Sequence, residues 1–194
     1  MFAFEGWDAA GKGGAIRRLT AAMDPLSFAV YPYAAPNAVE RMYHYLWRFW
    51  QNVPAPGEIS IFDRTWYGRV MVERIEKLTP DVDWRRGYAE INEMEKQWSE
   101  ANMVLAKFWL QIDQEEQARR FKDREENPEK EWKITEEDWR NRAKWSDYEA
   151  AVNEMIARTN TDYAPWIIVE ANSKYYARLK VLETVIDLLE KKLK

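Results

Sequence analysis

A glycine-rich segment near the N-terminus constrains the fold of this chain more than any other feature. Gly6, Gly11 and Lys12 have the spacing G-x-x-x-x-G-K, in which backbone N–H groups turn inward around phosphate oxygens and the lysine adds positive charge. An apolar run, residues 1–4, precedes the segment, and a helical pattern, residues 15–23, follows it. Strand, glycine-rich loop and helix in this order predict a phosphate-binding loop, with an ordinary strand-to-helix turn as the alternative.

One position in this loop departs from the usual pattern. Lys12 is followed by Gly13, where most such loops have a Ser or Thr whose hydroxyl binds Mg²⁺. An acid, Asp8, lies inside the loop instead. The sequence therefore predicts a triphosphate-type site whose metal ion is held by carboxylates.

Length and composition exclude several classes of protein. A chain of 194 residues suits one domain spanning 1–194, and the absence of cysteine excludes disulfides and thiolate chemistry. The net charge of −4 argues against a nucleic-acid binder with a wholly basic surface, although a polyanion could bind in a local basic channel. No long apolar run and no signal-peptide pattern is present, so we expect a cytoplasmic protein without a membrane partner. The single histidine, His44, is expected to make a structural hydrogen bond, with proton transfer as the alternative.

Apolar and helical segments alternate along the chain. Helical spacing of apolar residues marks 83–101 and 175–193, and the poorly alternating apolar segments are typical of buried parallel strands. We therefore predict an α/β fold with a five-stranded parallel sheet flanked by helices. The predicted strands are 2–4, 28–33, 59–62, 103–110 and 166–169.

A charged helical insertion, about 114–158, separates the last two predicted strands. Pro128 forces a break, and Thr135 with Asp138 has the spacing of a capping box that restarts a helix. Two helices joined by a hinge at this place are predicted to form a lid. Because the chain begins so close to the loop, we also expect a truncated N-terminus.

Asp63 closes the third predicted strand. Ligands gather at the carboxyl ends of strands in open parallel sheets, so Asp63 is expected beside the loop. Together, Asp8 and Asp63 could hold Mg²⁺, which prefers oxygen ligands, with Mn²⁺ as a substitute. The alternative for Asp63 is a helix N-cap.

Several other charged residues could contact phosphate. Arg64 could grip a phosphate or position Asp63 through an ion pair, and Glu73 could contact the acceptor or form an ion pair on its helix. Arg120 and Arg124 lie on one helical face and could close over the transferring group, with Lys130 and Lys133 after the break and Arg17 behind the loop. The alternative is surface ion pairs, since residues 119–144 contain nine Lys or Arg and eight Asp or Glu.

Long motifs extend over nearly the whole chain: residues 5–14, 61–70 with 72–74, Arg120, Phe121 and Arg124 with 133–135, Asp138 and Trp139, and Thr159, Thr161, 164–166 and Lys174. In sequence and in order, these motifs resemble those of the type-2 polyphosphate kinases. Thr65 is one departure, because the family usually has Ser at that position.

This resemblance implies a P-loop kinase fold similar to thymidylate kinase and Mg²⁺-dependent phosphoryl transfer between inorganic polyphosphate and a nucleotide. It implies that Asp8 and Asp63 bind the metal. Arg64, Arg120 and Arg124 would contact the transferring group. Phosphate and nucleotide contacts are expected at Gly6, Ala9, Ala10, Gly11, Lys12, Gly13, Gly14, Arg17, Tyr67, Glu73, Lys130 and Lys133.

The acceptor is also suggested by resemblance. Residues 133–142 and 169–172 are most similar to the polyphosphate:AMP phosphotransferase branch, which favours AMP as acceptor and ADP as product in a reversible reaction. GMP and GDP remain open as substrates, and a homo-oligomer is expected.

Two alternative functions remain at this point. The first is an ATP-dependent nucleoside monophosphate kinase, which would usually have Ser or Thr where this chain has Gly13. The second is a non-catalytic scaffold. The small number of residues before Gly6 favours this alternative. The intact Asp8, Lys12 and Asp63 argue against the scaffold.

Overall fold

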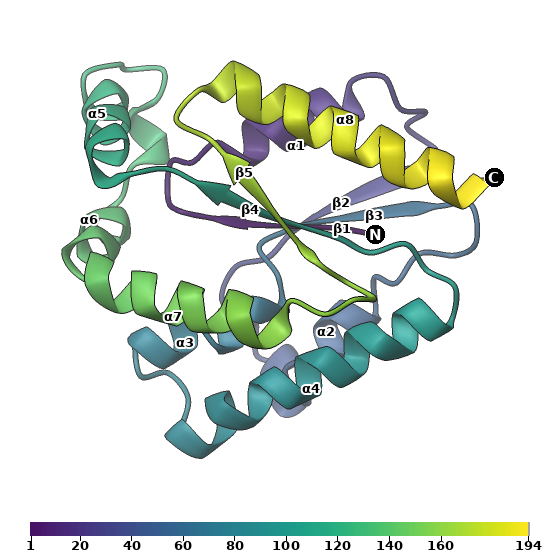
Figure 1. Ribbon diagram of the computed structural model, residues 1–194. Helices are drawn as coiled ribbons and strands as arrows, with labels where there is room; N and C mark the ends of the chain where they lie inside the picture. Colours follow the sequence, from purple (N-terminus) through teal and green to yellow (C-terminus); the bar gives the residue numbers. More distant parts are fainter. Residues whose placement is uncertain (194) are drawn as a thin grey trace.

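The computed structural model describes residues 1–193, with side chains through residue 192. Five parallel strands form one sheet in the order β2-β3-β1-β4-β5 (Figure 1). This confirms the predicted five-stranded α/β fold. The strands are β1 (Phe2–Gly6), β2 (Phe28–Pro32), β3 (Ile59–Asp63), β4 (Ala106–Gln111) and β5 (Trp166–Glu170).

Helices cover both faces of the sheet (Figure 1). One face carries α1 (Lys12–Thr20) and α8 (Lys174–Leu193), which contact each other. The other carries α2 (Trp47–Trp50), α3 (Val72–Ile75), α4 (Asp81–Glu100) and α7 (Trp145–Thr159). Among the described residues, no helix is both long and apolar enough to cross a membrane.

Apolar side chains on both faces of the central strands form the core. Phe4 on β1 stacks on Phe108 of β4 with ring centroids 4.9 Å apart, and Phe62 of β3 is fully buried. Double-sided burial explains why the central strands β1 and β4 lack alternation in sequence. Most boundaries differ from the prediction by one to three residues. The largest shifts are at β4, which begins at Ala106 after the turn that ends α4, and at α1, which both begins and ends three residues earlier than predicted.

A buried ion pair crosses the sheet–helix interface. Glu95 on α4 accepts a hydrogen bond of 2.8 Å from the Lys107 Nζ on β4, and neither side chain is exposed. Burial raises the pKa of Glu95 and lowers the pKa of Lys107, and in each case the partner's charge opposes that effect. The Lys107 Nζ also donates to the Thr159 carbonyl at 2.7 Å, which ties α4, β4 and the end of α7 together.

The insertion contains three helices rather than the two predicted. The break near Pro128 and the capping box at Thr135 and Asp138 are confirmed. However, α7 begins two residues after α6 ends and buries its Met155 side in the core against α4, because its apolar spacing continues to residue 159. The outer part, which we call the outer hairpin, comprises α5 (Gln114–Glu125), a 3₁₀ turn (Glu131–Lys133) and α6 (Glu136–Ala143).

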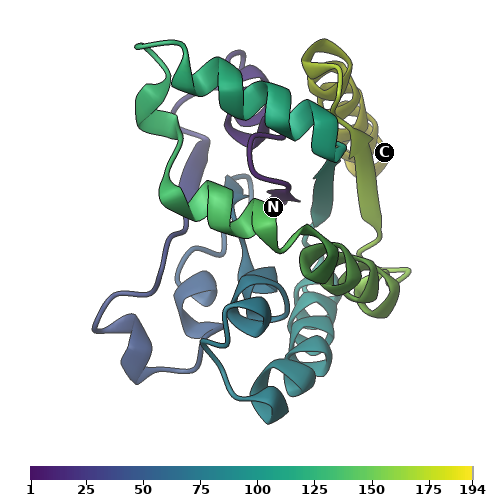
Figure 2. The ribbon, with the colours of Figure 1, turned by 90° about the vertical axis from the view of Figure 1, so that its left-hand side faces the viewer.

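The outer hairpin lies at the carboxyl end of the sheet. Figure 2 shows α5 and α6 above and below the end of β1. The Phe121 ring on α5 packs edge-on against Trp139 of α6 with centroids 5.1 Å apart. His44 lies in the segment between β2 and α2, where its Nε2 is 3.5 Å from Glu90 and its Nδ1 accepts from the Leu46 N–H. That contact agrees with the structural role expected for it.

Candidate active site at the carboxyl end of the sheet

The glycine-rich segment forms a tight loop between β1 and α1, as predicted. Gly6 has φ +152°, and a Cβ on it would lie 2.6 Å from the Leu110 carbonyl oxygen. Gly11 has φ +105° and Ala9 φ +62°, both in the left-handed region. The loop, with α1 starting at Lys12, therefore requires glycine at two of the predicted positions.

The Lys12 side chain folds back across this loop. Its Nζ donates to the Gly6 carbonyl at 2.8 Å, so the ammonium lies at the loop's mouth. An ammonium there, with the N-terminal N–H groups of α1 behind it, makes a favourable place for an anion.

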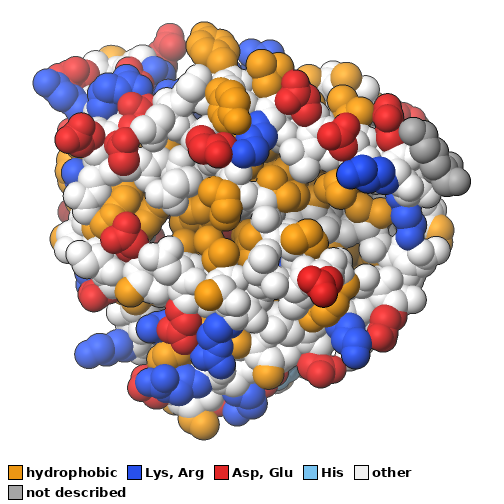
Figure 3. Space-filling model, in the orientation of Figure 1, with side chains coloured by type: hydrophobic (Ala, Val, Ile, Leu, Met, Phe, Trp, Pro, Cys, Tyr) orange, Lys and Arg blue, Asp and Glu red, His pale blue; other side chains and the backbone are white. Residues whose placement is uncertain are grey.

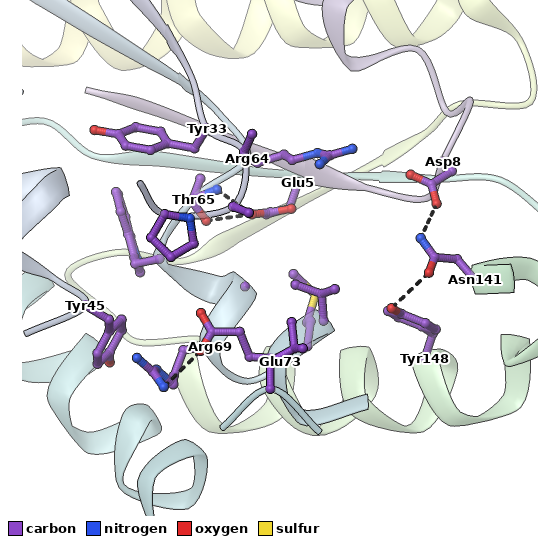
Figure 4. A pocket seen from close by; sticks show the side chains of 18 of the residues that line it. Glu5, Asp8, Tyr33, Tyr45, Arg64, Thr65, Arg69, Glu73, Asn141 and Tyr148 are labelled. Carbon is purple, nitrogen blue, oxygen red and sulfur yellow. Dashed lines mark hydrogen bonds and ion pairs between the residues drawn. The ribbon is translucent and has the colours of Figure 1, made fainter. Parts of the chain in front are cut away.

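A cleft of about 690 Å³ opens beside the loop. Its walls come from β1, the turns after β2 and β3, and the α6–α7 junction (Figure 4). Five of the predicted site residues line it: Gly6, Asp8, Lys12, Arg64 and Glu73.

Asp8 and Asp63 lie at the same edge of the sheet. Asp63 is the last residue of β3 and is in register with Phe4 of the neighbouring β1, while Asp8 follows β1 directly in the loop. Asp63 is half-buried and is followed by Arg64, which lines the cleft. The strand order thus brings both acids to the loop edge, as predicted from sequence.

The donor set fits a hard cation bound in part by substrate. The carboxylate of Asp8 has the neutral amide of Asn141 as its hydrogen-bond partner, so its charge is not offset there. Within residues 1–193, no group of three or more Asp, Glu, His or Cys side chains could hold a metal ion. Two carboxylates with water and phosphate oxygens are the ligands Mg²⁺ commonly takes.

The turn after β3 is held by a residue that the sequence analysis did not select. Glu5, buried at the end of β1, accepts from the Thr65 N–H at 2.7 Å and from the Thr65 hydroxyl at 2.8 Å. Burial raises the pKa of Glu5, against the opposing effects of Lys12, Thr65 and Arg64. An acid inside an otherwise apolar strand is the signal that could have identified it.

Arg64 has an unusual backbone conformation. Its φ is +66°, a left-handed value that costs a non-glycine residue energy, and its N–H donates to the Phe4 carbonyl at 3.2 Å. The side chain is exposed and lines the cleft. In Figure 4 the Arg64 side chain extends toward the side of the cleft where Asp8 lies.

Tyr67 does not lie where it was predicted. Its side chain is fully buried; its hydroxyl donates to Glu95 at 2.6 Å and accepts from the Lys107 Nζ at 2.9 Å. Burial, followed by the charge of Glu95, raises the pKa of Tyr67 well above its usual range. Tyr67 therefore anchors the turn after Arg64 to the core, and the expectation that it contacts nucleotide is corrected.

The prediction that Arg120 closes over the transferring group is also wrong. Only 2% of it is exposed, and its guanidinium donates to four backbone carbonyls and to Glu116. Two of these carbonyls, Ala9 and Ala10, belong to the phosphate loop and lie 2.8 and 2.9 Å from Nη1. The other two, Ala171 and Asn172, follow β5. With its donors taken up in this way, Arg120 clamps the loop rather than closing over a substrate.

The remaining predicted cations lie outside the cleft. Arg124 donates to the Lys133 carbonyl at 2.8 Å, Lys130 pairs with Asp123 at 2.9 Å, and Arg17 is exposed on α1. Acidic and basic side chains are mixed over the α5 end of the molecule (Figure 3). The structure thus does not bring Arg124, Lys130 or Arg17 into the cleft with Lys12.

Two residues near the α6–α7 junction contact the loop, and neither was among the predicted site residues. Trp145, at the start of α7, stacks on Trp7 of the loop with ring centroids 3.7 Å apart and planes 6° from parallel. Asn141 on α6 donates to the Asp8 carboxylate at 3.0 Å. These partners are far apart in sequence, so no local spacing could have indicated them.

The wall opposite Asp8 is aromatic and basic. In Figure 4, Tyr33 and Tyr45 lie on the other side of the cleft from Asp8. The Arg69 guanidinium lies 4.1 Å from the Tyr45 ring centroid and pairs with Glu73 at 2.9 Å. Glu73 also accepts from the Thr79 hydroxyl at 2.7 Å, so this predicted residue is held in an ion pair at the cleft wall.

A parallel sheet with a glycine-rich loop, a lysine in that loop and an acid closing the neighbouring strand defines a P-loop kinase fold. A family model described as Polyphosphate kinase 2 (PPK2) matches residues 1–194. The chain belongs to the polyphosphate kinase 2 family.

Individual relatives agree with this assignment. The chain is 57% identical over 188 residues to a polyphosphate:AMP phosphotransferase of Pseudomonas syringae pv. tomato, covering 97% of this chain and 38% of that protein. It is 39% identical over 187 residues to ADP-polyphosphate phosphotransferase 3 of Rhizobium meliloti, covering 96% and 66%. A crystal structure of a Pseudomonas aeruginosa PA01 protein, assigned there to polyphosphate kinase 2, superposes with a TM-score of 0.97 at 55% identity and covers 99% of this chain and 42% of that one.

Proposed function

We propose that this domain transfers the terminal phosphoryl group of inorganic polyphosphate to AMP, giving ADP, and that the reaction is reversible. The observation that carries the proposal is one cleft lined by Asp8, Lys12 and Arg64, with Asp63 closing the adjacent strand. The name of the relative that is 57% identical supports it. Because the chain spans 38% of that relative, the activity of the domain itself is what must be measured.

The step makes one P–O bond and breaks another. An oxygen of the acceptor phosphate attacks the terminal phosphorus, and the bridging oxygen leaves on a polyphosphate that is one unit shorter. Such transfer depends on positioning and charge neutralisation. Lys12 and the loop N–H groups, including those of Gly11, Gly13 and Gly14, would bind phosphate oxygens, and Arg64 would hold the transferring group.

Asp8 and Asp63 would hold the Mg²⁺ ion, with Mn²⁺ as a substitute, and the bound ion would supply positive charge to donor and acceptor oxygens. Arg124, Lys130 and Lys133 would approach the cleft through movement of the tip of the outer hairpin, residues 124–135, while Arg120 and Asn141 keep their contacts with the loop. Arg17 would extend the binding surface for a long polyanion along α1.

The acceptor end of the cleft suits a nucleotide. Tyr33 and Tyr45 present aromatic rings. Arg41 and Arg48 also line the cleft, and the Arg48 guanidinium lies 4.6 Å from the Tyr33 ring centroid. AMP is preferred to ADP in this proposal because a second acceptor phosphate would compete with the donor for the space beside Lys12. GMP and GDP are tested as alternative acceptors.

The chain is further proposed to act as a homo-oligomer in the cytoplasm. Light scattering at several protein concentrations tests the assembly, and a monomer throughout would contradict it. The activity assay does not depend on this result.

The experiment is a donor and acceptor matrix read by ³¹P NMR. Polyphosphate or ATP is combined with AMP, ADP, GMP or GDP in the presence of Mg²⁺. We expect ADP from polyphosphate and AMP, with a higher kcat/KM for AMP than for ADP. Turnover with ATP but not polyphosphate would instead support a nucleoside monophosphate kinase, and no turnover with either donor would support a scaffold.

A further inference from the structure

A chain of hydrogen bonds connects the loop acid to the α6–α7 junction (Figure 4). The Asn141 Nδ2 donates to the Asp8 Oδ2 at 3.0 Å, and the Tyr148 hydroxyl donates to the Asn141 Oδ1 at 3.3 Å. The three side chains come from the phosphate loop, α6 and α7. All three line the cleft.

The chemistry of the three side chains determines which group donates and which accepts in each hydrogen bond. A carboxylate can only accept, so the amide must turn its Nδ2 toward Asp8 and its Oδ1 toward Tyr148. The Tyr148 hydroxyl is also 3.5 Å from Glu76, but the Lys144 Nζ already donates to both oxygens of Glu76 at 2.8 Å. Of the two acceptors within reach of the tyrosine hydroxyl, the Asn141 Oδ1 is the nearer, at 3.3 Å.

Packing holds the same region in place. Trp7 and Trp145 stack in parallel, which fixes the start of α7 beside the loop. The Gln117 Nε2 donates to the Asp8 carbonyl at 3.2 Å, so the backbone and the carboxylate of Asp8 are held by different elements. Asn141 is the described partner of the carboxylate.

We propose that Asn141 is a positioning residue that orients the Asp8 carboxylate for metal binding, and that Tyr148 fixes the orientation of the amide. The proposal rests on the metal role proposed for Asp8. A neutral amide suits this task because it holds one oxygen of Asp8 without offsetting its charge, whereas lysine or arginine would compete with the metal ion. Partners that orient a metal ligand are commonly worth tenfold or more in metal affinity.

Metal affinity can be measured without turnover. The free Mn²⁺ signal in electron paramagnetic resonance is followed as Mn²⁺ alone is titrated into the unsubstituted protein and its variants. We expect Asn141→Ala to weaken Mn²⁺ binding by about tenfold. Tyr148→Phe should weaken it by a smaller factor, because the amide keeps its donor but can rotate.

The matched control is Asn92→Ala. Asn92 on α4 donates its amide to the Arg158 carbonyl at 3.0 Å, away from the loop. We expect its Mn²⁺ affinity to equal that of the unsubstituted protein. In turnover, rising Mg²⁺ should restore the kcat of Asn141→Ala, and the KM for AMP should change little.

Mn²⁺ binding by Asn141→Ala equal to that of the unsubstituted protein would overturn the proposal, as would equal weakening in Asn92→Ala. Should Asn141→Ala fail to fold, Tyr148→Phe, which removes one oxygen atom, gives the same comparison. Failure of the unsubstituted protein to use polyphosphate would overturn the proposed function alone, because the Mn²⁺ titrations do not require turnover.

Discussion

Arg120 and Arg124 lie one turn apart on α5, yet their surroundings differ completely. The Arg120 side chain is 2% exposed and donates to carbonyls of the phosphate loop, whereas that of Arg124 is 22% exposed and donates to Lys133 within the outer hairpin. The first half of α5 thus belongs to the scaffold of the site, and its second half belongs to a peripheral hairpin. The two arginines have different roles because different elements pack against them: Arg120 contacts the phosphate loop, and Arg124 contacts the outer hairpin.

The same contrast holds for the acids on α5. Glu116 accepts from Arg119 at 2.6 and 2.7 Å and from Arg120 at 2.5 Å, and is largely buried. Asp123 pairs with Lys130 at the surface, where both side chains are about two-fifths exposed. Surface pairs of that kind contribute between nothing and about 1 kcal/mol. Substitutions in the two halves should therefore differ in their effect on the free energy of unfolding.

The largest expected effect belongs to Arg120→Ala. Removing a buried guanidinium leaves loop carbonyls and part of Glu116 without a partner, and we expect a loss of about 3 kcal/mol in the free energy of unfolding, measured by urea titration. Displacement of the loop should also lower kcat by about a hundredfold. Arg120→Lys should recover little, because one ammonium cannot reach four carbonyls.

The two halves of α5 should also differ in how much they contribute to the loss of stability at low pH. Hydrogen bonds from Arg119, and then Arg120, lower the pKa of Glu116 against the effect of burial. A lowered folded-state pKa stabilises the protein above the unfolded value of 4.5, and that contribution is lost as the pH falls through the folded value. Glu116→Gln should therefore reduce the loss of stability below pH 4.5.

The control for this acid prediction is Asp123→Asn. The Lys130 ammonium lowers the pKa of Asp123 too, but the pair is at the surface. We expect its acid-unfolding curve to follow that of the unsubstituted protein closely. Equal shifts in the two variants would remove the distinction between the halves of α5.

Arg124→Ala should have the smallest effect on stability, under about 1 kcal/mol. Its effect should fall on kcat instead, as part of the roughly 10³-fold that an arginine can contribute at a transferring phosphoryl group. Parallel urea titrations and steady-state kinetics separate the two quantities. A variant with full kcat would leave Arg124 as a surface residue.

Sequence alone predicted the parts of the site that are local in the chain. The strand, loop and helix around Gly6–Lys12 and the acid that closes β3 follow from spacing and from the rule that ligands gather at strand ends. The capping box at Thr135 likewise depends on residues three apart. Each of these features is fixed by backbone geometry over a few residues.

What the sequence missed depends on tertiary contacts. Asn141 and Asp8 are 133 positions apart, and Arg120 is 111 positions from Ala9. Arg120 was assigned to a lid because its charge and its helical face are compatible with a lid. They are equally compatible with the loop contacts that the structure shows. Tyr67 was assigned to phosphate or nucleotide binding on the family resemblance, but the 3₁₀ turn Trp66–Arg69 directs it to Glu95 in the core.

Removing one carboxylate with little change in shape tests the proposed site most directly. Asp63→Asn and Asp8→Asn are compared with the unsubstituted protein by ³¹P NMR, with polyphosphate, AMP and limiting Mg²⁺. We expect unchanged unfolding curves and a fall in the rate of ADP formation of roughly three orders of magnitude, about 4 kcal/mol in the barrier. An Asp63→Asn variant that forms ADP at the unsubstituted rate would contradict the assignment of Asp8 and Asp63 to one metal-dependent phosphoryl-transfer site.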